Sequence, residues 1–307
     1  MVPPRQVYSA YSLVVASETP LPCPPARIGS TPDIKIVRAN HLDTSGIAVR
    51  EGVWFQRDRI PDGSDHLRWG DLFECRVSPD GRLLEYKELS GATDAAFSAY
   101  VLTSALSFSL LKLDVEHLHA TCVVVDERVV GFLGQPGAGK STLAAQFVVA
   151  GARLLTDDLL VLMSDGRHLQ AQPGLPRIKL VPESARAVFG DNLHGMPMNP
   201  LTSKLVCPLD AEQFCDEQRP LACLYVLDPG AGPFAIDRLP PQEAFLALTE
   251  HTYNAAVAEP ERLRRHFNFT ASVSRRTLTK RLSVPRGFDK LAQVREGVLK
   301  DLTGMQA

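Results

Sequence analysis

Apolar and β-branched residues occur in short runs, separated by turn residues, along roughly the first ninety positions of the chain. Runs of this length bounded by Pro, Gly, Asn or Asp are typical of strands. We expect strands at 8–16, 33–37, 53–56, 73–77 and 82–86. The sequence Ser78-Pro79-Asp80-Gly81 between the last two predicts a hairpin turn. The pattern therefore predicts a small β-rich lobe over residues 1–94, and we find no catalytic spacing in it.

The pattern changes at residue 95. Residues 95–113 have apolar side chains on nearly every turn, few helix breakers and helical length, so they predict a buried helix. Further strands are expected at 121–125, 129–133, 153–155, 159–163 and 222–227, and helices at 140–150, 241–248 and 288–302. Such alternation favours a largely buried sheet. The predicted fold class is α/β, or α+β overall when the N-terminal lobe is included, with a second domain over residues 95–307.

Composition and charge exclude several classes of protein. The chain has 307 residues, of which 45% are hydrophobic, and its formal net charge is −2. That apolar content is too high for an intrinsically disordered protein. The near-neutral charge argues against a nucleic-acid coat or an anionic membrane surface, so we expect neither nucleic acid nor membrane as a partner. We find no secretory signal, no run of 18 apolar residues and no CxxC pair among the six cysteines, which predicts a cytoplasmic protein with reduced thiols.

The most specific feature is the run Gly134-Gln135-Pro136-Gly137-Ala138-Gly139-Lys140-Ser141-Thr142, which satisfies GxxxxGK[ST] between an expected strand and an expected helix. Glycines let successive backbone N–H groups turn toward phosphate oxygens, and the helix N-terminus adds partial positive charge. In such a loop Lys140 reaches the β- and γ-phosphates, and the Ser141 hydroxyl ligates Mg²⁺. We therefore expect this run to bind a nucleoside triphosphate.

A second feature is the pair Asp157-Asp158, which lies inside an apolar run shortly after the helix that follows the loop. Two adjacent carboxylates are costly to bury unless they meet a cation or share a proton. A strand beginning there would lie beside the phosphate loop. One carboxylate could then hold Mg²⁺ while the other accepts a proton from an attacking hydroxyl.

The segment from Leu118 to Leu162 resembles the catalytic core of HPr kinase/phosphorylase and of the HPr-kinase-like proteins of biosynthetic gene clusters. The matching order is a histidine, a strand, a hairpin, the phosphate loop, a helix and the motif G-x-x-L-L-x-D-D. The rest of the chain matches loosely. The resemblance implies a P-loop kinase core whose fold is shared with phosphoenolpyruvate carboxykinase. It also implies transfer of the γ-phosphoryl group of ATP to a serine hydroxyl of a peptide or protein.

The resemblance also implies roles for individual residues. Lys140 and the loop amides would hold the phosphates of ATP, and Ser141 with Asp158 would contact Mg²⁺. Asp157 would be the base that activates the acceptor hydroxyl, and His119 would lie next to the transferring phosphate. Without the resemblance, His119 reads as an ordinary structural histidine beside a strand. Oligomers occur in the family, so the resemblance allows this chain to form a homo-oligomer.

Two departures from the family pattern point to a dedicated kinase. The bifunctional enzymes usually have Glu where this chain has Thr142, and we do not find their glycine- and arginine-rich phosphorolysis signature. In size and layout, the nearest analogues are the kinases that phosphorylate a ribosomal precursor peptide, as in lasso peptide clusters. A small-molecule kinase that acts on a sugar or metabolite, and a non-catalytic nucleotide-binding regulator, are the alternatives.

Basic residues are needed to neutralise phosphate charge in transit. The candidates are Lys179, Lys204 and Arg286, each of which can equally be a solvated surface cation. Lys204 follows the loop 190–200, which has a composition suited to closing over a site. A basic C-terminal third, with residues 262–266 at its start, could receive an acidic peptide or form an ordinary helix surface.

Overall fold

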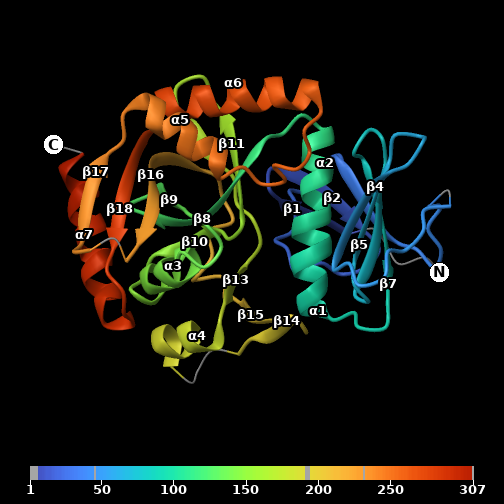
Figure 1. Ribbon diagram of the computed structural model, residues 1–307, viewed down its shortest axis with the longest axis horizontal. Coiled ribbons are helices and arrows are strands. Elements are labelled where there is room, and N and C mark those ends of the chain that lie inside the picture. The colour runs from blue at the N-terminus through green and yellow to red at the C-terminus, as the bar shows by residue number, and fades with distance from the viewer. Residues whose placement is uncertain (1–5, 45, 191–193, 231, 306–307) are drawn as a thin grey trace. The chain divides into compact units, whose positions relative to one another are not determined.

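A computed structural model describes residues 6–44, 46–190, 194–230 and 232–305, and the chain divides into two units (Figure 1). Unit 1 contains Met1–Glu116 and Met196–Thr202, and unit 2 contains His117–Gly195 and Ser203–Ala307. Both helices and several sheets are present, so the fold is of the mixed α/β kind.

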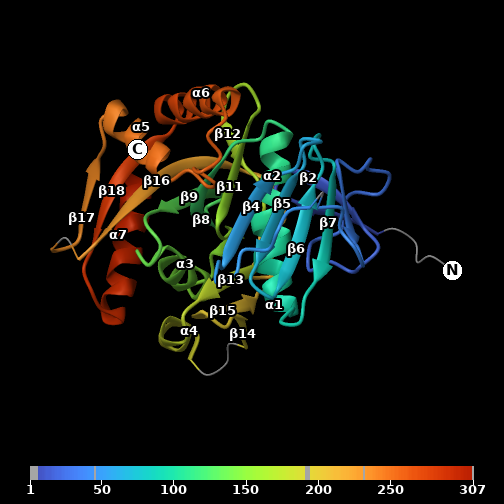
Figure 2. The same ribbon diagram turned by 45° about the vertical axis from the view of Figure 1, so that its right-hand side comes forward.

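Unit 1 contains a seven-stranded sheet, in the order β1-β2-β3-β7-β6-β5-β4 (Figure 2). The strands are β1 Gln6–Ala10, β2 Leu13–Ser17, β3 Ile34–Arg38, β4 Phe55–Arg59, β5 Asp65–Trp69, β6 Phe73–Val77 and β7 Leu83–Glu88. β3 pairs parallel with both β2 and β7, and the other neighbours are antiparallel. Alternate side chains of β6, Phe73, Cys75 and Val77, are buried, as period-two burial requires.

A long helical segment follows the sheet: α1 (Asp94–Ala96), a π-helical stretch (Phe97–Ala105) and α2 (Leu106–Lys112). The ring of Phe97 packs 5.0 Å from that of Tyr86 and 6.0 Å from that of Phe73. This packing groups the helix with unit 1, so the unit boundary falls at residue 116 rather than at the expected position 94. The segment is apolar and long enough to cross a membrane, but 89% of its apolar window is buried inside the structure, as in core helices.

Strand β8 (His117–Val125) is central to unit 2 and pairs antiparallel with β9 (Arg128–Leu133), β10 (Arg153–Thr156) and β11 (Leu159–Ser164). β9 continues into parallel pairing with β16 (Arg219–Pro229), which pairs parallel with β18 (Leu278–Val284). The remaining strands of this unit are β12 Leu169–Ala171, β13 Arg177–Leu180, β15 Thr202–Pro208 and β17 Ala235–Arg238, while β14 Met196–Asn199 belongs to unit 1. β13 pairs antiparallel with β15.

Helices cover both faces of the unit 2 sheet. Alternate residues of its strands point to opposite sides, and the apolar residues on each side pack against helices. Phe132 and Tyr225 face a core that also contains Phe147 of α3 (Lys140–Val149) and residues of α7 (Leu291–Gly304). Leu224, one position from Tyr225, faces a second core. That core contains residues of α5 (Pro241–Glu250) and α6 (Pro260–Arg276). The remaining helices are α4 (Pro182–Phe189) and the short 3₁₀ turn Phe288–Lys290.

Three elements differ from the sequence-based expectation for a physical reason. The single strand expected at 8–16 is a hairpin, because Tyr11 and Ser12 adopt left-handed φ values of 53° and 71°. β5 was missed because its first residue, Asp65, is a buried carboxylate that ion pairs satisfy. α6 was missed because its buried face is largely polar, with Arg262, His266, Thr270 and Val273 at helical spacing.

Candidate active site

The phosphate-loop motif connects β9 to α3, as its flanking patterns predict. Gly137 and Gly139 have φ values of 88° and 94°, in the region where a side chain is strained, so the loop conformation depends on glycine at both positions. α3 begins at Lys140, and its first turn carries Ser141 and Thr142. The loop therefore lies at the N-terminus of a buried ten-residue helix, where backbone N–H groups lack intrahelical partners.

The Lys140 side chain lies over this loop. Its ammonium donates to the carbonyl oxygen of Gly134 at 2.6 Å and to that of Gln135 at 3.3 Å. Only 7% of the residue is exposed. Burial lowers the pKa of Lys140, while the charges of Asp157 and Asp158 act in the opposite direction. The ammonium is thus held at the loop, where the charges of both carboxylates act on its pKa.

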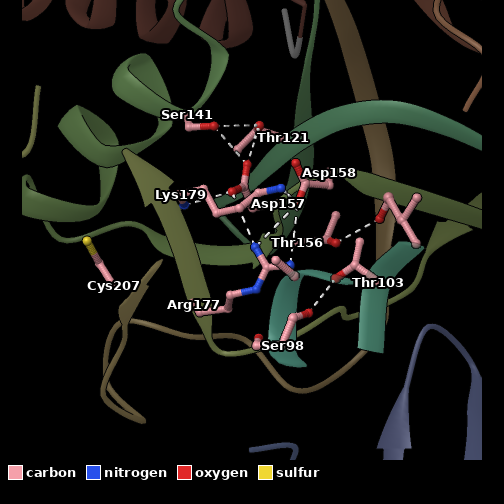
Figure 3. A network of polar contacts seen from close by, with 12 residues as sticks. Ser98, Thr103, Thr121, Ser141, Thr156, Asp157, Asp158, Arg177, Lys179 and Cys207 are labelled. Carbon is pink, nitrogen blue, oxygen red and sulfur yellow. Dashed lines mark hydrogen bonds and ion pairs between the residues drawn. The ribbon is translucent and has the colours of Figure 1, made fainter. Parts of the chain in front are cut away.

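Asp157 receives donors on both carboxylate oxygens (Figure 3). Its Oδ1 accepts hydrogen bonds from the hydroxyls of Ser141 at 2.9 Å and Thr121 at 2.8 Å. Its Oδ2 accepts from the backbone N–H of Lys179 at 2.9 Å. The side chain is 1% exposed. The carboxylate is therefore fixed against the phosphate-loop serine.

Asp158 faces a different set of partners. It has a left-handed φ of 82°, which non-glycine residues seldom adopt. Its Oδ2 lies 2.5 Å from Nζ of Lys179 and 3.3 Å from the Arg177 guanidinium (Figure 3). Burial alone would raise the pKa of Asp158, but the charges of Lys179 and Arg177 outweigh it and hold that pKa well below its usual range. Asp158 is therefore an ionised carboxylate in a buried ion cluster.

His119 is brought to the same place by the register of the sheet. It pairs directly with Leu159, the residue after Asp158, across β8 and β11. Burial and then the charge of Lys140 lower the pKa of His119 to about 4, although the charge of Asp158 opposes this shift. The imidazole is consequently neutral at pH 7, and the Tyr253 ring stands edge-on to it at 5.7 Å.

The predicted site residues thus gather in unit 2, but the partners of the two aspartates differ from the expected ones. The expected metal pair was Ser141 and Asp158, whereas the Ser141 hydroxyl bonds Asp157. Asp158 instead pairs with Lys179 and Arg177.

Sequence reasoning missed several neighbours of this site. Arg177 and Thr121 contact Asp157 and Asp158 but were not selected. The alternation Arg177-Ile178-Lys179 was an available signal, since strand periodicity places both cations on one face.

The segment after α5 was also missed. The Gln135 side-chain amide donates to Glu250 Oε1 at 2.6 Å, and the backbone N–H of His119 donates to the carbonyl of His251 at 2.7 Å. Burial lowers the pKa of His251, the charge of Glu250 opposes this shift, and the charge of Lys140 adds to it, so a second histidine lies within electrostatic reach of the loop.

The other basic candidates have different surroundings. Lys204 lies on β15 and its charge contributes to lowering the pKa of Lys140, whereas Arg286 lines a cavity beside the phosphate loop. The proposed basic surface of the C-terminal third is partly internal: Arg262 bonds three backbone carbonyls, and Lys280 pairs with Asp301 at 2.7 Å. In the loop 190–200, residues 191–193 lie outside the described part of the chain.

The donor set at Ser141 and Asp157 fits Mg²⁺. A hydroxyl and a carboxylate oxygen lie 2.9 Å apart, and both are hard oxygen ligands of the kind this ion prefers. Within the described ranges, no three His, Cys, Asp or Glu side chains gather to form a metal cage. A magnesium ion here would therefore complete its shell with water and phosphate oxygens, as it usually does in nucleotide sites.

Comparison with known proteins gives a distant likeness. No family model and no curated protein sequence matches the chain. Among solved structures, the HPr(Ser) kinase/phosphatase from Coxiella burnetii is similar with a TM-score of 0.35 and 13% identity, over 62% of this chain and 99% of that one. A likeness at this level assigns neither family nor function.

Proposed function

We propose that the protein is a kinase that transfers the γ-phosphoryl group of ATP to a hydroxyl, with a serine of a peptide or protein as the acceptor. The observation that carries this proposal is the hydrogen bond from the phosphate-loop Ser141 to Asp157, beside a second carboxylate held by two cations. The serine acceptor is supported by the resemblance of the segment 118–162 to HPr-kinase-like cores.

On the donor side, the loop amides and Lys140 would hold the phosphate chain. Lys140 already lies over the loop carbonyls, so its ammonium needs only a short movement to reach a β- or γ-phosphate. Ser141 and Asp157 would hold Mg²⁺, whereas the family resemblance implied Ser141 and Asp158. When bound, the ion neutralises charge on the β- and γ-phosphate oxygens.

On the acceptor side, we assign Asp158 to the incoming hydroxyl. Its side chain is 11% exposed, against 1% for Asp157. Lys179 and Arg177 both contact Oδ2 of Asp158, whereas both oxygens of Asp157 accept hydrogen bonds. The acceptor oxygen forms a bond to the γ-phosphorus, the bond between that phosphorus and the β–γ bridging oxygen breaks, and the hydroxyl proton passes to the Asp158 carboxylate. A carboxylate with a lowered pKa suffices, because the transition state is loose and the proton leaves late.

Lys179 and Arg177 would neutralise the phosphoryl group in transit, since both cations lie against Asp158. Neutral His119 could donate a hydrogen bond without adding positive charge. Catalysis in this scheme comes mainly from positioning and charge neutralisation.

The test combines γ-labelled ATP, Mg²⁺ and panels of serine-containing precursor-type peptides and sugars, read by mass spectrometry. Asp158→Asn should retain ATP binding and lower transfer by about 10²-fold or more. Asp157→Asn should raise the Mg²⁺ concentration needed for half-maximal activity. Asp216→Asn, at an exposed position outside the site, is the matched control and should behave as the unaltered protein.

Each outcome has a clear meaning. Label on a peptide serine supports the peptide kinase, and label on a sugar alone replaces that acceptor by a small molecule. An Asp157→Asn variant with an unchanged Mg²⁺ dependence refutes the metal assignment. Absence of both transfer and ATP hydrolysis with the unaltered protein refutes the kinase.

A further inference from the structure

Unit 1 contains a cavity of about 410 Å³. The residues that line it come from the segment after β2, from β6 and β7, and from the start of the long helical segment. All of them belong to unit 1, and none is part of the candidate active site. The volume is within the range of small-ligand sites in proteins. Unit 1 thus has a possible binding site that the proposed kinase chemistry does not use.

The inner part of the cavity is apolar and aromatic. Phe73, Tyr86 and Phe97 line it, and the three centroid distances between their rings are 5.0, 6.0 and 6.3 Å. Leu21, which follows β2, is a further buried lining residue. Mutual packing of the rings keeps this surface in place, so it is suited to the aliphatic stem of a ligand.

The charged residues of the lining are both acidic. Glu88 at the end of β7 and Asp94 at the start of α1 are exposed. Oε2 of Glu88 pairs with the Arg38 guanidinium at 2.5 Å, so a guanidinium is already accommodated at this carboxylate. Among the residues that the structure describes, no cation pairs with Asp94. The cavity therefore combines an apolar interior with a negatively charged rim.

We propose that this cavity binds a basic side chain of a peptide, with its alkyl stem against Leu21 and Phe97 and its cationic end at Asp94 and Glu88. Arginine and lysine bury their methylene stems on apolar surface and keep the charged group near water, which is the order of apolar and acidic groups here. Asp94 provides a carboxylate without a counter-ion, and Oε1 of Glu88 provides a second acceptor. The inference does not rest on the proposed kinase function, because none of these residues takes part in phosphoryl transfer.

Methyl NMR of the full chain tests this proposal, with the methyl groups of Leu21 as reporters inside the cavity. The probes are a blocked glycine peptide with one central arginine and the same peptide with citrulline, which keeps the shape of arginine but has no charge. A third probe, butylguanidine, has the side chain without the peptide. We expect the arginine peptide to shift the Leu21 signals and to bind about tenfold more tightly than the citrulline peptide. Added salt should weaken this binding, because the carboxylates are exposed.

Substitutions separate the charged rim from the apolar interior. Asp94→Asn and Glu88→Gln should each weaken binding of the arginine peptide by about three- to fivefold, the effect of an exposed ion pair. Ala92→Leu adds a large side chain to the lining and should abolish the shifts at Leu21 while both acids remain. Matched substitutions at exposed positions outside the lining should leave the affinity unchanged: Glu51→Gln, Asp216→Asn and Ala48→Leu.

The outcomes that overturn the proposal differ from one another. Equal affinities for the arginine and citrulline peptides refute a cation site. Asp94 lies in the first turn of the helical segment, where an acid also stabilises the helix N-terminus. A lower urea midpoint in Asp94→Asn with unchanged peptide affinity would assign Asp94 to that structural role alone and refute the site. Tighter binding of butylguanidine than of the arginine peptide would refute a peptide as the occupant.

Discussion

Replacing Lys179 by Met should destabilise unit 2, because it leaves a buried cluster with one uncompensated negative charge. The cluster contains Asp157 and Asp158 with Lys179 and Arg177, and the ion pair between Lys179 and Asp158 spans 2.5 Å with side chains only 13% and 11% exposed. Coulomb's law with an effective permittivity of about 20 gives an attraction of roughly 7 kcal/mol at that distance.

Desolvation of the two ions offsets most of that attraction, so the pair itself is close to neutral in net stability. Removing one partner is different, since the remaining carboxylate stays buried without its counter-ion. We expect Lys179→Met to lower the free energy of unfolding by about 3–5 kcal/mol. The Asp158→Asn, Lys179→Met double variant should recover at least about 1 kcal/mol relative to the sum of the two single changes.

The assay is urea unfolding followed by circular dichroism and by hydrogen exchange at the strands of unit 2. Tryptophan fluorescence is unsuitable because Trp54 and Trp69 both lie in unit 1. The exposed pair Arg281–Glu243, 3.4 Å apart with side chains 48% and 52% exposed, is the control, and Arg281→Met should cost less than about 1 kcal/mol. Strictly additive effects of Lys179→Met and Asp158→Asn would refute the coupled cluster.

Three further outcomes are expected. Gly131→Val should destabilise unit 2 by about 1–3 kcal/mol in urea unfolding, because a Cβ there would lie 2.6 Å from the buried side chain of Leu224; an unchanged midpoint would contradict the close packing. Arg262→Ala should cost more than about 2 kcal/mol in the same assay, since three backbone carbonyls lose a buried charged donor; a cost no larger than that of Arg264→Ala would argue against this role. The pKa of His119 lies near 4 when folded and near 6.5 when unfolded, so the unfolded chain binds more protons between these values. Stability should therefore fall as pH drops from 6.5 toward 4, and His119→Gln should reduce that fall, which acid titration of the unfolding transition can measure.

The elements that the sequence predicted well are those whose burial follows simple periodicity. β6 at 73–77 matches the expected strand, and α3 matches the helix expected at 140–150 to within one residue at its end. In both, most of the buried positions carry apolar side chains. α6 has the opposite character: its buried positions include Arg262 and His266, whose partners come from outside the helix. Its apolar residues Leu263 and Phe267 are exposed, so the apolar positions of this helix do not mark the face that is buried.

The candidate site was predictable to the extent that it is local in sequence. The phosphate loop carries its chemistry in nine consecutive residues, so the motif locates it. Arg177 and Thr121 reach Asp157 and Asp158 from other strands, and their place depends on sheet register. Arg286, one of the basic candidates, lies far along the chain between β18 and the 3₁₀ turn Phe288–Lys290, and its place beside the loop glycines follows from the tertiary fold.

The different partners of the two aspartates follow from the backbone conformation at Asp158. In an ordinary strand, adjacent side chains point to opposite faces of the sheet. The dipeptide alone therefore does not indicate which of the two aspartates faces the phosphate loop. Here the left-handed φ of 82° at Asp158 makes the turn between β10 and β11, and Thr156 Oγ1 stabilises it by donating to the carbonyl of Leu159 at 2.7 Å. The turn leaves Asp157 against Ser141 and directs Asp158 to Lys179. Two chemically identical residues thereby acquire different partners and different charge environments, a difference that is absent from the dipeptide itself.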